Sequence, residues 1–163
     1  TETLADTPGL VALPVYPWQH TVVVSPDHPL ADLPANKATE LTLERIAHYP
    51  IVTYDRKFSG RPTIDEAFAQ AGIVPNIVLE AIDADVIKTY VDVGLGIGII
   101  AGMAFDPRRD KGLAGLPAGH LFGTHTTRVA LREGSFLRDY MYLFLEMLSP
   151  ELTRERVEKA MYG

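Results

Sequence analysis

The residues best suited to chemistry lie in the stretch "TYDRKFSGRPTIDEAF", residues 53–68. A short β-branched run is followed by a polar loop, and Pro62, of a type favoured at the first helical position, opens a helix. Ser59, Gly60 and Arg61 therefore stand where backbone N–H groups are unpaired and the helix dipole is positive. A hydroxyl, a backbone open to close approach and a guanidinium together favour a small anion such as carboxylate or sulfate.

A purely structural interpretation of the same residues stays open. Ser59 can simply cap the helix, and Arg61 can pair with Asp65 four residues later. Trp18, in "VYPWQH", is the only tryptophan of the chain. Its ring fits either the core, which is the commoner place for tryptophan, or the wall of a ligand site.

The glycine run in "DADVIKTYVDVGLGIGII", residues 83–100, resembles a phosphate-binding loop only superficially. A dinucleotide fingerprint needs a strand, then glycines, then a helix, whereas here a helix precedes the glycines and a strand follows them. Gly94 is expected to end the helix, and Gly96 and Gly98 to lie in a strand where a neighbouring group approaches closely. A nucleotide site is therefore not expected here.

Catalytic and metal-binding patterns are missing from the sequence. The five histidines, at positions 20, 28, 48, 120 and 125, have no paired-ligand spacing, and the chain has no cysteine. The serine in "FSGRP" lacks the glycine that a G-x-S-x-G nucleophile elbow requires. We therefore expect neither an enzyme nor a bound cofactor or metal.

The charge of the chain argues against nucleic-acid binding by these 163 residues alone, because the net charge is −6. The densest basic cluster, Arg108, Arg109 and Lys111, is interleaved with Asp106 and Asp110. Apolar runs are far shorter than the roughly 20 residues of a membrane span. The first residues do not form a signal peptide, and the missing initiator methionine leads us to expect a piece of a longer protein.

Strands and helices are expected to alternate along the first two thirds of the chain. Strands are predicted at residues 10–16, 21–25, 51–54, 76–81 and 97–101, and helices over 42–48, around 62–71 and after Asp83. This order predicts a doubly wound α/β lobe with a buried, parallel central strand. Beyond a polar connection, a strand at 127–133, a long helix capped by Ser135 and a final helix over 153–161 need a second sheet to pack on.

Three stretches carry a family resemblance: "VVVSPDHPLA", the segment from "YPIVTYDRKFSGRP" to "GIIAGMAFDP", and "FLRDYMYLFLEMLSPELTRERV". The chain resembles the effector-binding domain of LysR-type transcriptional regulators, and within that family its CysB-like branch. The most specific parts are "DADVIKTYV…GLGIG" and the "FLRDYMY" helix. The resemblance covers nearly the whole chain.

The resemblance implies an α/β fold of two lobes, like that of periplasmic binding proteins, with an effector in the cleft between them. Residues 1–13 would be the crossover from a first lobe, 14–121 the complete second lobe, and 122–163 the strand and helices that return to the first. The family's N-terminal winged helix-turn-helix would lie outside this chain. The chain would then bind DNA only through that missing domain, act in the cytoplasm and form a homo-oligomer.

The resemblance also implies the site and its ligands. Thr1 and Trp18 match cleft residues, and Ser59 stands where related proteins carry a threonine, so that the hydroxyl is kept. The implied effectors are N-acetylserine, sulfate or thiosulfate, in a regulator of sulfur assimilation and cysteine biosynthesis. These anions agree with the anion site read from Ser59, Gly60 and Arg61. A periplasmic-type solute-binding protein for a small anion is the alternative, because it would share the fold.

Overall fold

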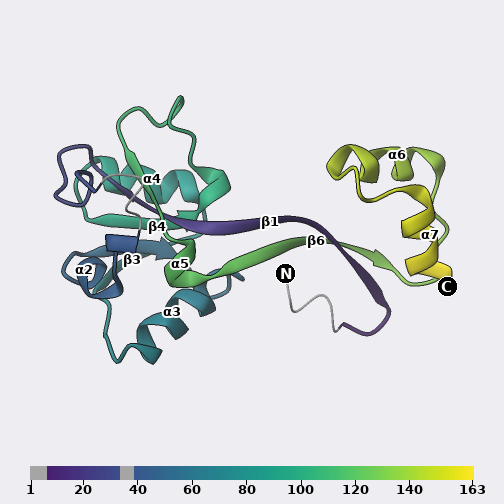
Figure 1. Cartoon of the computed structure of the whole chain (residues 1–163), viewed down its shortest axis with the longest axis horizontal. Helices are drawn as coiled ribbons and strands as arrows, with labels where there is room; N and C mark the ends of the chain where they lie inside the picture. Colours follow the sequence, from purple (N-terminus) through teal and green to yellow (C-terminus); the bar gives the residue numbers. More distant parts are fainter. Residues whose placement is uncertain (1–6, 34–38) are drawn as a thin grey trace. The chain divides into compact units, whose positions relative to one another are not determined.

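The computed structural model describes residues 7–33 and 39–163 of the chain (Figure 1). It divides into two compact units, the larger formed by Trp18–Thr124 and the smaller by Thr1–Pro17 with His125–Gly163. Separate groups of buried apolar side chains form their cores. No helix in the described ranges is long and apolar enough to cross a membrane.

The larger unit is built on a mixed sheet with the strand order β3-β2-β4-β1-β5. Strand β2 pairs in parallel with β3 and β4, whereas β1 pairs antiparallel with β4 and β5. The α/β fold is as predicted, but the central strand β4 has one antiparallel neighbour, so the sheet is not purely parallel. The strands are β1 Leu10–Val24, β2 Ile51–Tyr54, β3 Ile77–Ala81, β4 Ile97–Ala101 and β5 Ala114–Pro117.

Helices cover both faces of this sheet (Figure 1). One face packs on α2 Leu43–Ala47, α3 Arg61–Gln70 and α5 Gly119–Phe122, and the other on α4 Ala84–Asp92. Because side chains alternate along a strand, Val22 joins the α3 side of the core and Val23 the α4 side. This three-layer arrangement leaves β4 almost wholly buried, as its apolar sequence predicts.

The glycines that precede and enter β4 have the predicted structural roles. Gly94 follows α4 with a φ of 83°, a conformation that costs glycine little. A Cβ on Gly96 would overlap the carbonyl oxygen of Pro50, and one on Gly98 would lie 2.6 Å from Cγ2 of Val23. The run therefore packs a helix and strand closely together, and Asp83 caps α4 through Asp85 N–H and Val86 N–H.

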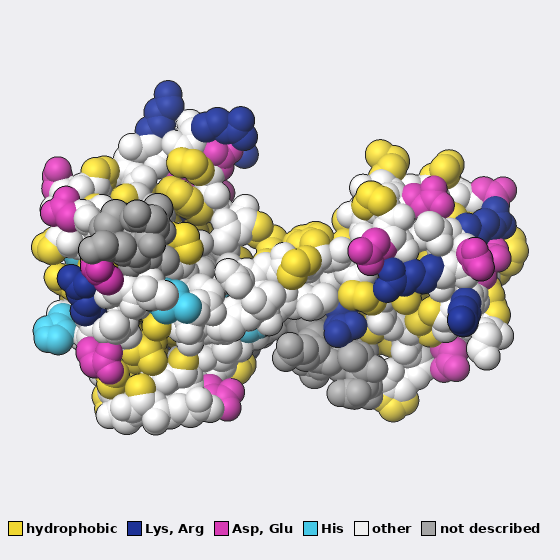
Figure 2. Space-filling view, viewed as in Figure 1, with side chains coloured by type: hydrophobic (Ala, Val, Ile, Leu, Met, Phe, Trp, Pro, Cys, Tyr) yellow, Lys and Arg dark blue, Asp and Glu magenta, His cyan; other side chains and the backbone are white. Residues whose placement is uncertain are grey.

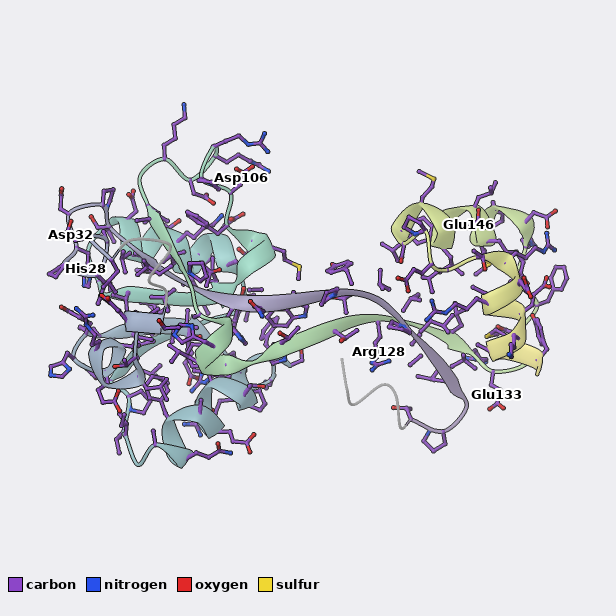
Figure 3. The ribbon with its side chains drawn as sticks, in the orientation of Figure 1. His28, Asp32, Asp106, Arg128, Glu133 and Glu146 are labelled. Carbon is purple, nitrogen blue, oxygen red and sulfur yellow. The ribbon has the colours of Figure 1, made fainter. Side chains whose placement is uncertain are left out.

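The loop that joins the 3-10 helix η2 Gly102–Ala104 to β5 contains Asp106, labelled in Figure 3, which is hydrogen-bonded to Asp110. The N–H of Asp106 donates to Oδ2 of Asp110 at 2.9 Å, and Nζ of Lys88 donates to Oδ1 of Asp110 at 3.0 Å. The sequence of this region predicts only a polar connection, so β5 and α5 were not expected. The basic side chains of residues 108, 109 and 111 are exposed on the loop (Figure 2).

The smaller unit combines the first half of β1 with β6 Thr124–Arg132, α6 Asp139–Leu148 and α7 Arg154–Tyr162. β1 is one strand of 15 residues, so the break predicted at 17–20 is wrong. The prediction that Ser135 caps the long helix is also wrong. Its hydroxyl donates to the carbonyl of Arg132, and the helix begins four residues later. The final helix is confirmed, with Thr153 as its cap.

Helix α6 has apolar side chains on two faces. Leu145 and Tyr142 are buried in the core of the smaller unit. A second set, on the opposite side, is exposed, and Figure 2 shows apolar side chains on this surface. We call this set the outer α6 stripe; it comprises Tyr140, Leu143, Phe144 and Met147, which are 61–85% exposed. A helix that is apolar on both sides is usually covered on both sides.

Candidate functional site

The candidate site is centred on the N-terminus of α3. Gly60 occupies the N-cap position in a helical conformation, with φ −80° and ψ −19°. No side chain of the described residues makes a cap hydrogen bond there, so Ser59 does not cap the helix. Ser59 is exposed, which leaves its hydroxyl open to a ligand. The interpretation in which Ser59 only caps the helix is therefore wrong.

The backbone at this end of α3 offers fewer free donors than a typical helix start. The N–H of Arg61 donates to the carbonyl of Phe58 at 3.0 Å, and Pro62 has no N–H. A bound anion would therefore depend more on the Ser59 hydroxyl as a hydrogen-bond donor than at a helix whose first N–H groups are all free.

An aromatic wall stands beside Gly60. The rings of Trp18 and His20 meet edge to face with centroids 5.0 Å apart, and His20 meets Phe122 in the same way at 5.4 Å. A Cβ on Gly60 would lie 3.0 Å from Cη2 of Trp18 and 3.0 Å from Nε2 of His20. The fold thus brings Trp18 to the start of α3 and leaves the residue partly exposed.

His20 belongs to this wall and was not predicted to. Its side chain is 1% exposed, packed between Trp18 and Phe122. Because alternate residues of a strand share a face, His20 lies on the same side of β1 as Trp18. The spacing Trp-x-His was visible in the sequence, but β1 was expected to be broken at these positions, which hid the relationship.

Arg61 is buried, with a side chain 1% exposed. Its Nε donates to Oδ1 of Asp65 at 2.8 Å, and its Nη1 lies 2.6 Å from the carbonyl oxygen of Tyr54 and 2.7 Å from Oε1 of Glu80. Burial disfavours the charged guanidinium, but the hydrogen bonds and charges of the two carboxylates outweigh it, so that the pKa of Arg61 is raised. The Arg61–Asp65 pair of the structural interpretation is therefore formed.

The remaining site residue named from the sequence, Thr1, lies outside the described residues. Trp18, Ser59 and Gly60 lie together around the start of α3. Within residues 7–33 and 39–163, no group of three His, Asp or Glu side chains is placed to hold a metal ion. The arrangement offers the Ser59 hydroxyl next to a backbone that lies close against an aromatic ring.

The comparisons with known proteins decide the family. The family model of the LysR substrate binding domain matches residues 1–153. The chain belongs to this family. A solved structure entitled the cofactor-binding domain of the Cbl transcriptional regulator superposes with a TM-score of 0.86 at 40% identity, over 98% of this chain and 68% of that one. The periplasmic-binding-protein-like α/β fold expected from the sequence is confirmed.

Similar full-length proteins are bacterial transcriptional regulators. This LysR substrate-binding domain is 52% identical to the HTH-type transcriptional regulator CysB of Burkholderia cenocepacia, over all of this chain and 50% of that protein. It is 55% identical to the regulator SsuR of the same organism, over 96% of this chain and 49% of that protein. The chain thus spans about half the length of these relatives.

Proposed function

We propose that this domain senses a small anionic effector, N-acetylserine, sulfate or thiosulfate, for a regulator of sulfur-assimilation and cysteine-biosynthesis genes. The observation that carries the proposal is the exposed Ser59 hydroxyl beside Gly60, whose backbone lies against the ring of Trp18. The likeness to CysB, SsuR and Cbl supports the sulfur connection. Thr1 is a further proposed ligand residue.

Neutral donors are well suited to hold such an anion. The Ser59 hydroxyl can donate a hydrogen bond to an anion, and the apolar rings beside Gly60 lower the local dielectric and strengthen that bond. The positive end of the α3 dipole adds a favourable field for negative charge. Ser59 in place of threonine leaves room for one more methyl group, so this protein is proposed to accept a slightly bulkier ligand than a threonine-containing relative.

The rest of the protein is proposed from the same relationship. Residues 14–121 would form one lobe, and residues 1–13 and 122–163 part of another that is completed by polypeptide outside this chain. The outer α6 stripe supports this, because it leaves large apolar side chains uncovered. DNA would be bound by a helix-turn-helix domain elsewhere in a cytoplasmic homo-oligomer, and effector binding would shift the lobes.

The polypeptide encoded before Thr1 separates this proposal from a periplasmic solute-binding protein. A helix-turn-helix segment is expected there, and a signal peptide would overturn the regulator. In the full-length protein, footprinting on a promoter of a sulfur-assimilation gene should change when N-acetylserine is added. An unchanged footprint, together with unchanged transcription, would contradict effector control.

A further inference from the structure

We infer that Arg61 is a positioning residue of the anion site, which fixes the start of α3 without contacting the ligand. The inference rests on the proposed anion site. Arg61 was expected to bind the anion directly, because guanidinium groups commonly bind sulfate and carboxylate. The contacts of the buried side chain indicate a different role.

The guanidinium joins three elements at one point. It reaches the carbonyl oxygen of Tyr54 at the end of β2, Asp65 one turn along α3, and Glu80 on β3. β2 and β3 are neighbouring parallel strands, so these contacts hold the first turn of α3 to the ends of both. Because a guanidinium is planar and rigid, binding several acceptors in this way fixes the position of Arg61 and of Gly60 before it.

The local charge also argues against a direct contact with an anion. Two carboxylates surround the one guanidinium of Arg61, and Nε of Arg56 lies 3.7 Å from the same Glu80. The charge of Arg61 is therefore balanced by Asp65 and Glu80 before any ligand binds, so that it adds little net attraction for an anion. Attraction of the ligand is left to the Ser59 hydroxyl and the helix dipole.

The contacts of Arg61 with Tyr54, Asp65 and Glu80, called the Arg61 clamp below, keep Gly60 in its position. A Cβ built on Gly60 would lie 3.0 Å from the rings of Trp18 and His20, so the helix start lies close against the aromatic wall. If the Arg61 clamp is lost, the first turn of α3 is free to move away from the rings, and Ser59 moves with it. Trp18, the only tryptophan, then reports the change through its fluorescence.

The test compares Arg61→Ala and Arg61→Lys with Lys88→Ala. Lys88 is the matched control because it also binds two carboxylates, Asp85 and Asp110, and a backbone carbonyl, but on α4 at the opposite face of the sheet. For each protein we would measure the Trp18 emission spectrum, its quenching by acrylamide, the melting temperature and the affinity for sulfate.

We expect Arg61→Ala to shift Trp18 emission to longer wavelength, to increase quenching and to weaken sulfate binding about tenfold. Arg61→Lys should recover part of the wild-type emission and part of the sulfate affinity, since an ammonium keeps the charge but not the planar fork. Lys88→Ala should lower the melting temperature and leave both emission and affinity unchanged. If Arg61→Ala does not fold, Glu80→Gln, which removes one charged acceptor, should show the same emission shift in smaller measure.

Two results would overturn the inference. If Arg61→Ala binds sulfate more weakly but has an unchanged Trp18 spectrum, Arg61 contacts the ligand. If neither the sulfate affinity nor the Trp18 spectrum changes, Arg61 has no positioning role. If the wild-type protein binds no sulfate, the proposed function fails. The emission of the variants without ligand still decides whether Arg61 holds α3 against Trp18.

Discussion

The backbone of Gly60 lies against the ring of Trp18, so closely that a methyl group on Gly60 would stand 3.0 Å from Cη2 of the indole. Gly60→Ala is therefore expected to push the start of α3 away from the aromatic wall. Overpacking of this kind costs about 1–3 kcal/mol in the free energy of unfolding. Urea unfolding would measure that cost, and the Trp18 emission should shift.

Ser59→Ala is the matched control for this change, because Ser59 is exposed and makes no cap bond among the described residues. It should leave the free energy of unfolding within about 0.5 kcal/mol of wild type. A Gly60→Ala protein with wild-type stability and emission would show that the wall and the helix do not meet as described.

Gly96→Ala should be among the most damaging single substitutions. Its Cβ would overlap the backbone carbonyl of Pro50, which cannot rotate away as a side chain can. We expect a loss of about 3 kcal/mol or more. Gly72→Ala serves for comparison, since Gly72 has open space but a φ of 69°, and should cost about 1–2 kcal/mol. Equal losses in chemical denaturation would contradict the packing at Pro50.

Asp110 makes the stability of the folded protein depend on pH in the acid range. The N–H of Asp106 donates to its carboxylate, and with Lys88 this outweighs burial and lowers its pKa below the ordinary 3.8. A carboxyl whose pKa is lowered by folding stabilises the protein above its unfolded pKa, and this stability is lost as the pH falls through the lower folded value.

Asp110→Asn should therefore lower the melting temperature at pH 7, and its difference from wild type should shrink below a pH of about 3.8. Thermal melts from pH 7 to pH 2.5 would follow this, with the exposed Asp27→Asn as a control. A difference between wild type and Asp110→Asn that stays constant over this range would contradict the role of the carboxylate.

The outer α6 stripe predicts that the chain on its own associates. Met147→Glu places a charge in the stripe and should shift the sedimentation coefficient toward that of a monomer without lowering the melting temperature, because Met147 is 85% exposed. Ala160→Glu, on the exposed side of α7, adds the same charge outside the stripe and should change nothing. A wild-type chain that is monomeric at high concentration would contradict the prediction that another surface covers the stripe.

The sequence predicted the larger unit well because its signals are local. Asp83 and Thr42 are typical cap residues, Gly72 and Gly94 end helices, and each has the predicted place. The mixed sheet was missed because strand direction depends on distant pairing, which no local pattern reveals. β5, with the sequence "AGLP", carries too few β-branched residues to be seen without the partner strand that makes it one.

The candidate site was predicted in part for a similar reason. Ser59 and Gly60 follow from the local pattern of loop and helix start. The buried state of Arg61 was not predictable, because it depends on Glu80, which reaches it from a neighbouring strand. His20 was missed since the strand that places it beside Trp18 was expected to be interrupted there.

The central claim is that Ser59 holds an anionic effector at the start of α3. Calorimetric titration of the whole regulatory domain with sulfate and with N-acetylserine tests it most directly, comparing wild type with Ser59→Ala and Ser59→Thr. We predict saturable binding of at least one ligand, weakened about tenfold by loss of the hydroxyl and kept by threonine. Absence of binding, or equal affinity in wild type and Ser59→Ala, would contradict the claim.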